Sequence, residues 1–300
     1  MKILLTGANG LVGQKIKEEL AGMPHVQLTA TSLHPEIRPL ATDYRFETLD
    51  ITSATHLSDT VARHQPDVII NAAAQANVNA CEQDRILCRQ VNTEAVMDIT
   101  HIANRYGIHL VQISTDFVFN GQRSDYSEED IADPLNYYGT AKKEAEDYII
   151  EHAKRWSIIR TILVYGYVPG MNRQNLVTWV YHALKNGQSI NVVQDQYRTP
   201  TLAEDLAQAC SQIALQTKEG IFHVAGRELM SVEQIAHRVA EQFHLDAGLI
   251  TPVSSAWLNE PAIRPPKSGF NLMKAEKMLG FIPHSFQEGL TTLERQLHHN

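Results

Sequence analysis

The stretch "NYYGTAK" at residues 136–142 places a tyrosine and a lysine four positions apart. Positions i and i+4 share one face of a helix, so Tyr138 and Lys142 can point into the same cleft. A free tyrosine has a pKa of about 10, and a nearby ammonium lowers that pKa because it favours the phenolate. Tyr137 has an alanine at the corresponding position, so Tyr138 is the candidate proton donor for a carbonyl that accepts hydride. An exposed helix turn without chemistry is the alternative.

Two hydroxyl side chains precede this helix. The stretch "QISTDFVFNG" at residues 112–121 follows an apolar run that is typical of a buried strand, and Ser114 and Thr115 lie near the end of that strand. Parallel sheets bind ligands outside the carboxyl ends of their strands. A hydroxyl at this position can share the oxygen of a substrate with Tyr138.

The N-terminal stretch "TGANGLVG" at residues 6–13 spaces Gly7, Gly10 and Gly13 as G-x-x-G-x-x-G between a strand and a helix. The turn needs residues that tolerate positive φ, and a pyrophosphate needs close approach to the backbone. The N-terminus of the following helix offers free N–H groups to phosphates. This context predicts dinucleotide binding, and the alternative is a plain strand-to-helix turn.

The end of the second expected strand bears on the choice of dinucleotide. A carboxylate there would bind the adenosine ribose and favour NAD. Thr31 and Ser32 stand there instead, and Arg38 follows. Small hydroxyls with a nearby cation favour NADP, with NAD possible as the cofactor; alternatively, Arg38 points to solvent. Asp50 ends the third strand and either accepts a hydrogen bond from adenine or caps the helix that begins near Ser53.

Strands alternate with helices along the first half of the chain, which indicates βαβ units and a parallel sheet. We therefore expect an α/β fold, a Rossmann-type doubly wound parallel sheet with a smaller C-terminal substrate-binding lobe. The expected dinucleotide-binding domain spans 1–166 with a returning segment near 195–225, and 167–300 forms mainly the lobe. The expected strands are 2–6, 26–31, 44–50, 67–74, 108–114 and 157–166. The expected helices are 11–21, 53–64, 83–106, one that starts after Pro134 and runs to about residue 154, 173–186, 203–216, 231–243 and 286–298.

The composition excludes several classes of protein. Of the 300 residues, 43% are hydrophobic and 20% charged, which is ordinary for a globular chain. The net charge of -8 and the lack of a basic stripe argue against nucleic acid as a partner. No apolar run reaches membrane-spanning length, and no signal peptide is evident, so we expect a cytoplasmic protein. The three cysteines fit no zinc pattern and are expected to be buried thiols, and no metal site is predicted.

Taken together, these motifs resemble the extended short-chain dehydrogenase/reductases, and within them the dTDP-4-dehydrorhamnose reductase family. The resemblance runs nearly end to end through "GANGLVG", "PDVIINAAA", "STDFVFNG", "DPLNYYGTAK", "RTILVYG", "DQYRTPT" and "RPPKSGFNL". It implies NADPH-dependent reduction of a 4-keto nucleotide-sugar, dTDP-4-dehydro-L-rhamnose to dTDP-L-rhamnose. It also implies a small-molecule nucleotide-sugar as the partner, with a homodimer possible.

The same resemblance implies roles for individual residues. Thr115, Tyr138 and Lys142 form the catalytic set: Tyr138 donates the proton, and Lys142 holds the nicotinamide ribose and lowers the tyrosine pKa. The substrate contacts are Gln194, Arg198 and Arg264. Besides Thr31, Ser32, Arg38, Tyr138 and Lys142, the cofactor contacts are Gly7, Asn9, Gly10, Leu11, Val12, Gly13, Asp50, Ile51, Ala72, Ala73, Ala74 and Asn92.

Three features leave other functions open. The sequence has Asn79 where family members often have an acidic residue, and Ile162 and Leu163 where many have Ser and Trp. Related dehydratases carry an Asp–Glu pair after the threonine, whereas Asp116 is followed by Phe117 here. A nucleotide-sugar dehydratase or epimerase is one alternative, although the missing glutamate argues against dehydration. The other is a non-catalytic NADP-binding regulatory subunit, because the chain also resembles the regulatory subunit of methionine adenosyltransferase.

Overall fold

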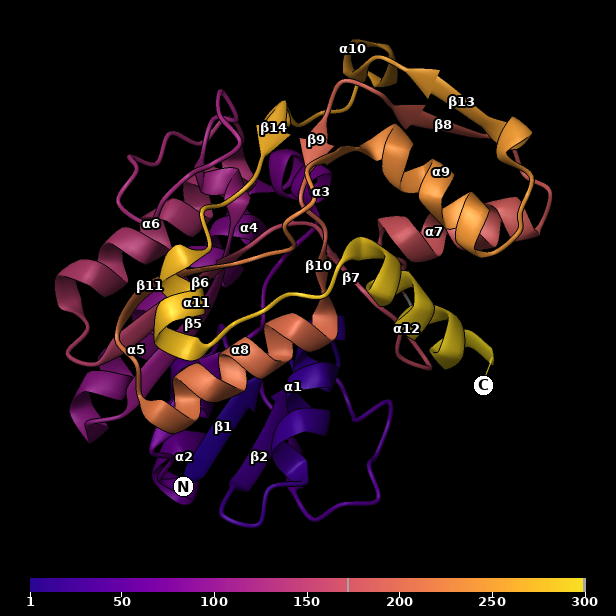
Figure 1. Cartoon of the computed structure of the whole chain (residues 1–300). Helices are drawn as coiled ribbons and strands as arrows, with labels where there is room; N and C mark the ends of the chain where they lie inside the picture. Colours follow the sequence, from indigo (N-terminus) through magenta and orange to yellow (C-terminus); the bar gives the residue numbers. More distant parts are fainter. Residues whose placement is uncertain (172, 299–300) are drawn as a thin grey trace.

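The computed structural model describes residues 1–171 and 173–298, and a parallel sheet of seven strands forms its centre (Figure 1). The predicted Rossmann-type fold is confirmed. The strand order β11-β6-β5-β4-β1-β2-β3 reverses direction between β1 and β4, and ligands of such sheets bind at this switch point. The strands are β1 (Lys2–Thr6), β2 (Gln27–Ser32), β3 (Arg45–Thr48), β4 (Val68–Asn71), β5 (His109–Thr115), β6 (Trp156–Thr161) and β11 (Gly220–Val224).

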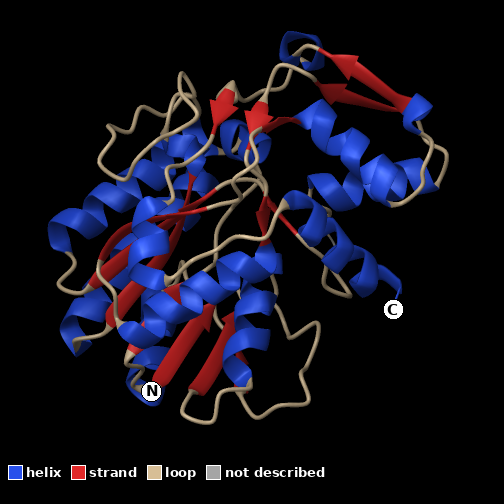
Figure 2. Ribbon diagram, viewed as in Figure 1, coloured by secondary structure: helices blue, strands red, loops and turns tan. Residues whose placement is uncertain are grey.

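Helices cover both faces of the sheet, which is why its central strands are continuous apolar runs (Figure 2). One face packs on α1 (Leu11–Ala21), α8 (Ala203–Gln216) and α11 (Met273–Leu279). The other face packs on α2 (Ala54–His64), α5 (Ala95–Tyr106) and α6 (Tyr137–His152). α8 and β11 come from the second half of the chain. The chain therefore leaves the sheet after β6, forms part of the C-terminal lobe, and then returns to pack against the sheet.

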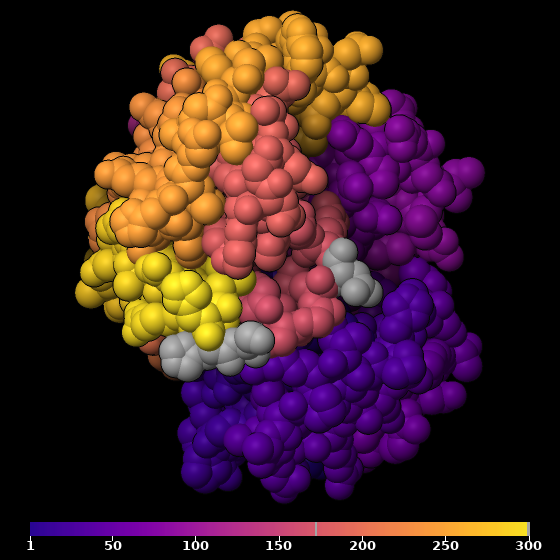
Figure 3. Space-filling model, turned by 90° about the vertical axis from the view of Figure 1, so that its right-hand side faces the viewer, coloured from indigo at the N-terminus to yellow at the C-terminus, as the bar shows by residue number. Residues whose placement is uncertain are grey.

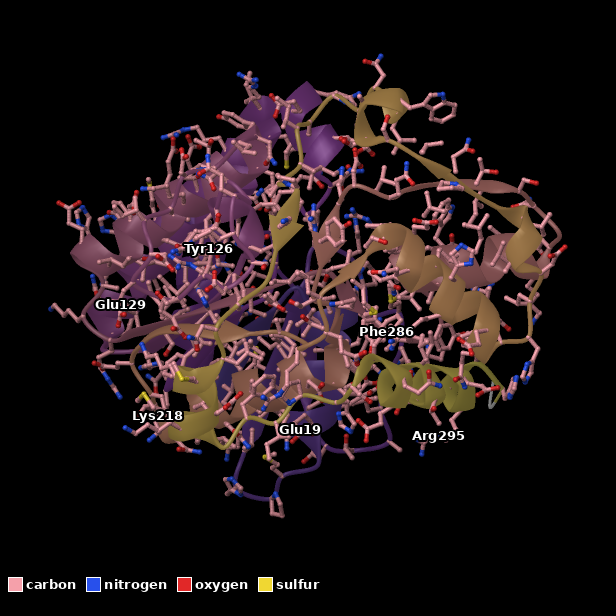
Figure 4. The ribbon with its side chains drawn as sticks, turned by 45° about the horizontal axis from the view of Figure 1, so that its top comes forward. Glu19, Tyr126, Glu129, Lys218, Phe286 and Arg295 are labelled. Atoms are coloured by element: carbon pink, nitrogen blue, oxygen red, sulfur yellow. The ribbon has the colours of Figure 1, made fainter. Side chains whose placement is uncertain are left out.

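The C-terminal lobe has its own apolar core (Figure 1). It is formed by the helices α7 (Leu176–Lys185), α9 (Val232–Gln242) and α12 (Phe286–His298). They are joined by the parallel strands β8 (Ile190–Val193) and β13 (Ile250–Val253), and the short helix α10 (Ser255–Leu258) follows β13. Figure 3 shows this lobe, salmon to yellow, seated on the indigo and purple body. Phe286, labelled in Figure 4, begins α12 and packs its ring edge-on against Tyr165 at 5.2 Å.

Strands of two residues join the lobe to the body. The pair β7 (Val164–Tyr165) and β10 (Thr201–Leu202) is parallel. β9 (Tyr197–Arg198) lies between β12 (Met230–Ser231), which is antiparallel to it, and β14 (Lys267–Ser268), which is parallel. This second small sheet places Arg198 opposite Ser268, beside the carboxyl edge of the main sheet.

Two predicted elements are wrong in detail. The helix expected over 83–106 begins at Arg85 and consists of α4 (Arg85–Arg89), a π-helical turn (Gln90–Glu94) and α5, which follow one another without a break; α3 (Val78–Gln83) is a separate helix before it. Asp84 separates the two, because its side chain accepts from Leu87 N and caps the start of α4. The strand expected over 157–166 ends at Thr161, because Leu163 has a φ of 39° that a strand cannot contain.

Candidate active site

The start of α6 is fixed by its cap and by a glycine. The Asn136 side chain accepts a hydrogen bond from Gly139 N at 2.9 Å, and this cap sets where the helix begins. A Cβ on Gly139 would lie 2.1 Å from Phe117 O, so only glycine lets α6 approach the 3-10 turn that follows Thr115 this closely. The glycine therefore brings Tyr138, its neighbour, next to the end of β5.

Tyr138 and Thr115 form a buried pair of hydroxyls. Tyr138 is 8% exposed and its ring meets Phe117 edge-on at 5.9 Å. Burial raises the pKa of Tyr138, while its hydrogen bond with Thr115 acts in the opposite direction. The expected lowering of this pKa is wrong: Lys142 does not offset the cost of burying a phenolate. Tyr138 consequently holds its proton at neutral pH.

Lys142 lies one helical turn after Tyr138 on the same face of α6. The side chain is 2% exposed, and Nζ donates to Ile113 O on β5 at 2.7 Å. Burial lowers the pKa of Lys142 to about 8, and the Glu146 carboxylate acts in the opposite direction. Tyr137 points elsewhere: its N–H donates to Glu82 Oε2, and Arg85 lies over its ring. The structure thus brings Tyr138 and Lys142 together and leaves Tyr137 outside.

The two hydroxyls at the end of β5 have different surroundings. Thr115 Oγ1 accepts from Phe117 N and contacts Asp116 Oδ1, each at 3.2 Å, besides its bond with Tyr138. Ser114 pairs in register with Arg160 of β6, is 3% exposed, and its Oγ has no hydrogen-bond partner among the described residues. Thr115 is therefore the hydroxyl that the fold places beside the tyrosine.

The glycine loop forms a tight cradle at the switch point. Gly7 has a φ of +69°, and a Cβ there would lie 2.6 Å from Ala73 N. A Cβ on Gly13 would lie 2.1 Å from Gly7 O, whereas Gly10 faces only Gly7 O, at 3.3 Å. No side chain caps the N-terminus of α1 at Gly10. The N–H groups of Leu11 and Val12 at this helix end suit an anionic phosphate.

At the end of β2 only one of the two predicted hydroxyls faces outward. Thr31 is fully buried and donates to Leu5 O at 3.0 Å, whereas Ser32 is half-buried. The Arg38 guanidinium, on the loop after β2, pairs with Glu18 of α1. Asn9 Nδ2 donates to His34 O and Pro35 O, so it ties this loop to the glycine loop.

The remaining predicted cofactor contacts line the same edge of the sheet. Asp50 Oδ1 accepts from Thr52 N at 2.9 Å and from Thr52 Oγ1 at 2.7 Å, next to buried Ile51. Ser53 caps α2, so the proposed cap by Asp50 is wrong. Asn92, in the π-helical turn, accepts from Gln75 N and donates to Gln75 O, each at 3.0 Å. It thereby holds the loop that continues from Ala72, Ala73 and Ala74.

Across from Thr115, the lobe contributes a buried cation. Arg198 is 4% exposed, and its guanidinium donates to Tyr197 O at 2.7 Å and to Gln196 Oε1 at 3.4 Å. Asp116 is 3% exposed; burial raises the pKa of its carboxyl, against the influence of Arg198 and Ser268. Asp116 and Gln196 were not predicted as site residues. Asp116 adjoins Thr115 in sequence, but no sequence signal indicated Gln196.

Arg264 reaches the same region from the loop between α10 and β14. Its guanidinium pairs with Glu260, with Nη2 to Oε1 at 3.0 Å, and Asn79 Nδ2 donates to that Oε1 at 3.3 Å. Asn79 is therefore explained by Glu260, because a carboxylate at position 79 would repel it. Gln194 is exposed, and its contact is a backbone bond to Val253 O at 3.0 Å. The structure does not bring Gln194 into the buried cluster.

Other kinds of site were sought in the described part of the chain. Residues 1–171 and 173–298 contain no group of three or more His, Cys, Asp or Glu side chains arranged to hold a metal. None of the helices described is both long enough and apolar enough to cross a membrane. The three cysteines are buried and free, as predicted.

A family model described as the RmlD substrate binding domain matches residues 1–298. The chain belongs to this family. The predicted resemblance to the dTDP-4-dehydrorhamnose reductases is thereby confirmed. Since the match extends across both the sheet and the lobe, the family assignment concerns the whole architecture and not the dinucleotide fold alone.

Individual proteins are similar to this chain over most of their length. A dTDP-4-dehydrorhamnose reductase of Aggregatibacter actinomycetemcomitans is 29% identical over 97% of this chain and 98% of its own. The methionine adenosyltransferase 2 subunit beta of Bos taurus is 28% identical over 85% of this chain and 76% of its own. The crystal structure of dTDP-4-dehydrorhamnose reductase from Bacillus anthracis in complex with NADP has a TM-score of 0.83 and 27% identity, and the match covers 100% of this chain and 99% of that one.

Proposed function

We propose that this protein reduces a 4-keto nucleotide-sugar, dTDP-4-dehydro-L-rhamnose, to dTDP-L-rhamnose with NADPH. The observation that carries the proposal is the buried trio at the carboxyl edge of the sheet. Tyr138 is hydrogen-bonded to Thr115, and Lys142 lies one helical turn away with its Nζ anchored 2.7 Å from Ile113 O. The reductase from Aggregatibacter actinomycetemcomitans, similar over nearly the full length, supports the choice of substrate.

The residues at the switch point fit a dinucleotide. A Cβ at Gly7 or Gly13 would lie 2.6 or 2.1 Å from backbone atoms, so the glycine loop has no room for side chains at these two positions. The N-terminus of α1 has no side-chain cap. The pyrophosphate would lie against Gly10, Leu11 and Val12. The half-buried Ser32, in place of a carboxylate, suits a 2′-phosphate. When bound, NADPH supplies the hydride, and the Bacillus anthracis relative in complex with NADP supports this choice of cofactor.

Tyr138 supplies the proton. Because burial raises its pKa, the hydroxyl remains protonated until negative charge develops on the substrate oxygen. The Thr115 hydroxyl lies beside the tyrosine, and if it turned from Asp116 toward the substrate oxygen it would fix the position of that oxygen. The Lys142 ammonium lies one helical turn from the tyrosine and would hold the ribose of the cofactor. Its positive charge stabilises the tyrosinate left after transfer.

The lobe would hold the diphosphate of the nucleotide-sugar. Arg264 is the more accessible of the two predicted cations, with 27% of its side chain exposed, and a guanidinium binds phosphate bidentately. Arg198 lies deeper and already donates to Tyr197 O and Gln196, so it shapes the wall beside Asp116. Gln194 remains a predicted substrate contact at the rim.

The test follows NADPH oxidation by its nicotinamide absorbance, with dTDP-4-dehydro-L-rhamnose generated in situ and other 4-keto nucleotide-sugars run in parallel. We expect oxidation that depends on the dTDP-4-dehydro-L-rhamnose and yields dTDP-L-rhamnose by chromatography. NADPH oxidation with only a different keto sugar would mean that the proposed substrate is wrong and the proposed reaction class is right. A dehydratase is disfavoured, because Phe117 stands where elimination needs a glutamate.

A regulatory subunit is the second candidate, and the similarity to methionine adenosyltransferase 2 subunit beta favours it. Such a protein would bind NADPH without turning it over. Tight NADPH binding in a fluorescence titration, together with no oxidation across the keto-sugar panel, would support this candidate. Formation of a stable complex with a methionine adenosyltransferase catalytic subunit by size-exclusion chromatography would then decide for it.

A further inference from the structure

The helix that carries the tyrosine and the lysine continues the same stripe with a third buried polar residue. Tyr138, Lys142 and Glu146 are spaced i, i+4 and i+8, so they lie on one face of α6. Glu146 is 2% exposed, and an isolated carboxylate at such a position would be very costly. It is compensated by Arg160 of β6, whose Nε contacts both carboxylate oxygens at 3.1 Å and whose Nη2 contacts Oε2 at 2.7 Å.

Arg160 is itself fixed on every side. It is 4% exposed, lies 5.1 Å from the Phe119 ring, and its Nη1 donates to His223 Nε2 at 3.4 Å. His223 can accept there because its Nδ1 lies 3.0 Å from Tyr126 O, which makes Nδ1 the protonated nitrogen. Burial lowers the pKa of His223 to about 3, so the ring adds no charge. Figure 4 labels Tyr126 on the body, at the outer end of this chain of contacts.

This arrangement has a consequence for the lysine. Lys142 pairs with no carboxylate of its own, and Nζ donates to Ile113 O, a neutral acceptor. The titratable groups around it are the Cys81 thiol of α3, the Cys88 thiol of α4, the Tyr138 hydroxyl and Glu146. Of these, Glu146 is the one carboxylate, and it lies one helical turn from the lysine on the same face of α6. Arg160, opposite Ser114 on the neighbouring strand, would oppose the ammonium if its own charge were not matched by the same carboxylate.

We propose that Glu146 is a positioning residue, which, held by Arg160, keeps the buried Lys142 side chain in its ammonium form. Among the described residues, neither side chain is hydrogen-bonded to Tyr138 or to the glycine loop, so the two act through the lysine alone. Burial by itself lowers the pKa of Lys142, and Glu146 is the largest influence that raises it. Replacing Glu146 with a neutral residue should therefore lower the pKa of Lys142 further. The link to catalysis rests on the proposed function, but the effect on the lysine does not.

The test measures the ionisation of Lys142 directly in the full-length protein. Lysine labelled at Nζ with ¹⁵N is followed by NMR across pH, and the Lys142 signal is assigned by its absence in Lys142→Arg. In Glu146→Gln we expect the Lys142 midpoint to move to lower pH by about one unit, the lower end of the effect of a nearby opposite charge. The amide keeps an acceptor for Arg160, and thermal unfolding with circular dichroism checks that the variant is folded.

Two variants control the result. Glu144→Gln removes a charge from the same helix on a face that pairs with Arg89, and should leave the Lys142 midpoint unchanged. Glu146→Asp keeps the charge and should restore most of the wild-type midpoint. An unchanged midpoint in folded Glu146→Gln, or an equal shift in Glu144→Gln, would overturn the proposal.

A second readout separates this inference from the proposed function. If the protein is a reductase, the loss of kcat/KM at high pH should begin about one pH unit lower in Glu146→Gln than in the wild type, with little change at pH 6. A shifted NMR midpoint in a protein that turns over no keto sugar would retain the role of Glu146 and reject the reductase. An unshifted midpoint in an active reductase would keep the reductase and reject the role of Glu146.

Discussion

Thr115, Tyr138 and Lys142 all come from one continuous unit, β5 and α6, whereas the facing wall of the site is assembled from segments far apart in the chain. On the sheet side, side chains are anchored by main-chain atoms: Thr115 by Phe117 N and Lys142 by Ile113 O. On the lobe side, Arg264 is held by the Glu260 side chain, which also accepts from Asn79. The first wall is fixed by the backbone, whereas Arg264 in the second wall is held by side chains that can exchange partners, unlike the buried Arg198, which donates to Tyr197 O.

This difference suggests a division of work. Proton transfer requires fixed distances, and positioning errors near 1 Å can cost about 100-fold in rate. Binding a flexible nucleotide-sugar instead needs cations that can release one anion and take another. The exposure agrees: Tyr138 and Lys142 are 8% and 2% exposed, whereas the Arg264 side chain is 27% exposed. Substitutions on the sheet side should therefore reduce kcat, and substitutions on the lobe side should change KM.

The largest expected effect is at the tyrosine. Tyr138→Phe should lower kcat about 10²–10⁴-fold, the usual contribution of a positioned general acid, and leave NADPH affinity nearly unchanged. Tyr137→Phe is the matched control, because Tyr137 is adjacent in sequence and contacts Glu82 and Arg85 instead. Steady-state kinetics and fluorescence titration of NADPH measure the two quantities. If Tyr137→Phe were the more harmful change, the assignment of the acid would be wrong.

A smaller but broader effect is expected at the glycine after it. A Cβ on Gly139 would meet Phe117 O at 2.1 Å, so Gly139→Ala should push α6 away from the 3-10 turn. Overpacking of this kind costs about 1–3 kcal/mol, and we expect a lower Tm together with a loss of kcat near 100-fold. Gly22→Ala is the control, since nothing lies within 4 Å of a Cβ there. Wild-type kcat in Gly139→Ala would show that the site tolerates movement.

The sheet-side wall could be predicted from the sequence because its signals are local. Spacing alone selected Tyr138 over Tyr137, and the glycine pattern directly after a strand located the cradle. What failed on this side depended on packing. The pKa of Tyr138 is raised and not lowered, and Thr31 turns inward to Leu5 O while Ser32 stays at the surface. Neither outcome follows from residue type without the burial of each side chain.

The lobe-side wall was less predictable because its elements are too short to leave a pattern. β9 and β14 have two residues each, below the length at which alternation can be recognised. The family resemblance supplied Arg198 and Arg264, but the partners that define their states, Gln196 and Glu260, were not predicted. The short helix α3 was missed for a related reason: it has only six residues and is cut off from α4 by the cap at Asp84.

A moderate effect on KM is expected at the Arg264–Glu260 pair. Arg264→Ala should raise KM for the nucleotide-sugar about tenfold, equal to about 1.4 kcal/mol, with little change in kcat. Glu260→Gln should lower KM about two- to fivefold. Exposed ion pairs contribute up to about 1 kcal/mol, and in this variant Arg264 would not have to break its ion pair with Glu260 before it binds the substrate. The control is Arg238→Ala, which breaks the pair between Arg238 on α9 and Glu228 before β12. A fall in kcat with constant KM in Arg264→Ala would remove the proposed division between the walls.

The smallest effect is expected in cofactor choice, at the far end of the sheet-side wall. Ser32→Asp should shift the ratio of NADPH to NADH affinity toward NADH by about tenfold, because the carboxylate repels a 2′-phosphate and accepts from a free ribose hydroxyl. Thr31→Asp is unsuitable, since that buried side chain would lose its bond to Leu5 O. The control is Thr48→Asp, which adds the same charge at the exposed residue paired with Ser32 on β3. Fluorescence titrations with both cofactors measure the ratio. An equal shift in both variants would attribute the preference to general charge and not to a contact by Ser32, and tighter binding of NADH than NADPH by the wild type would contradict the choice of NADP itself.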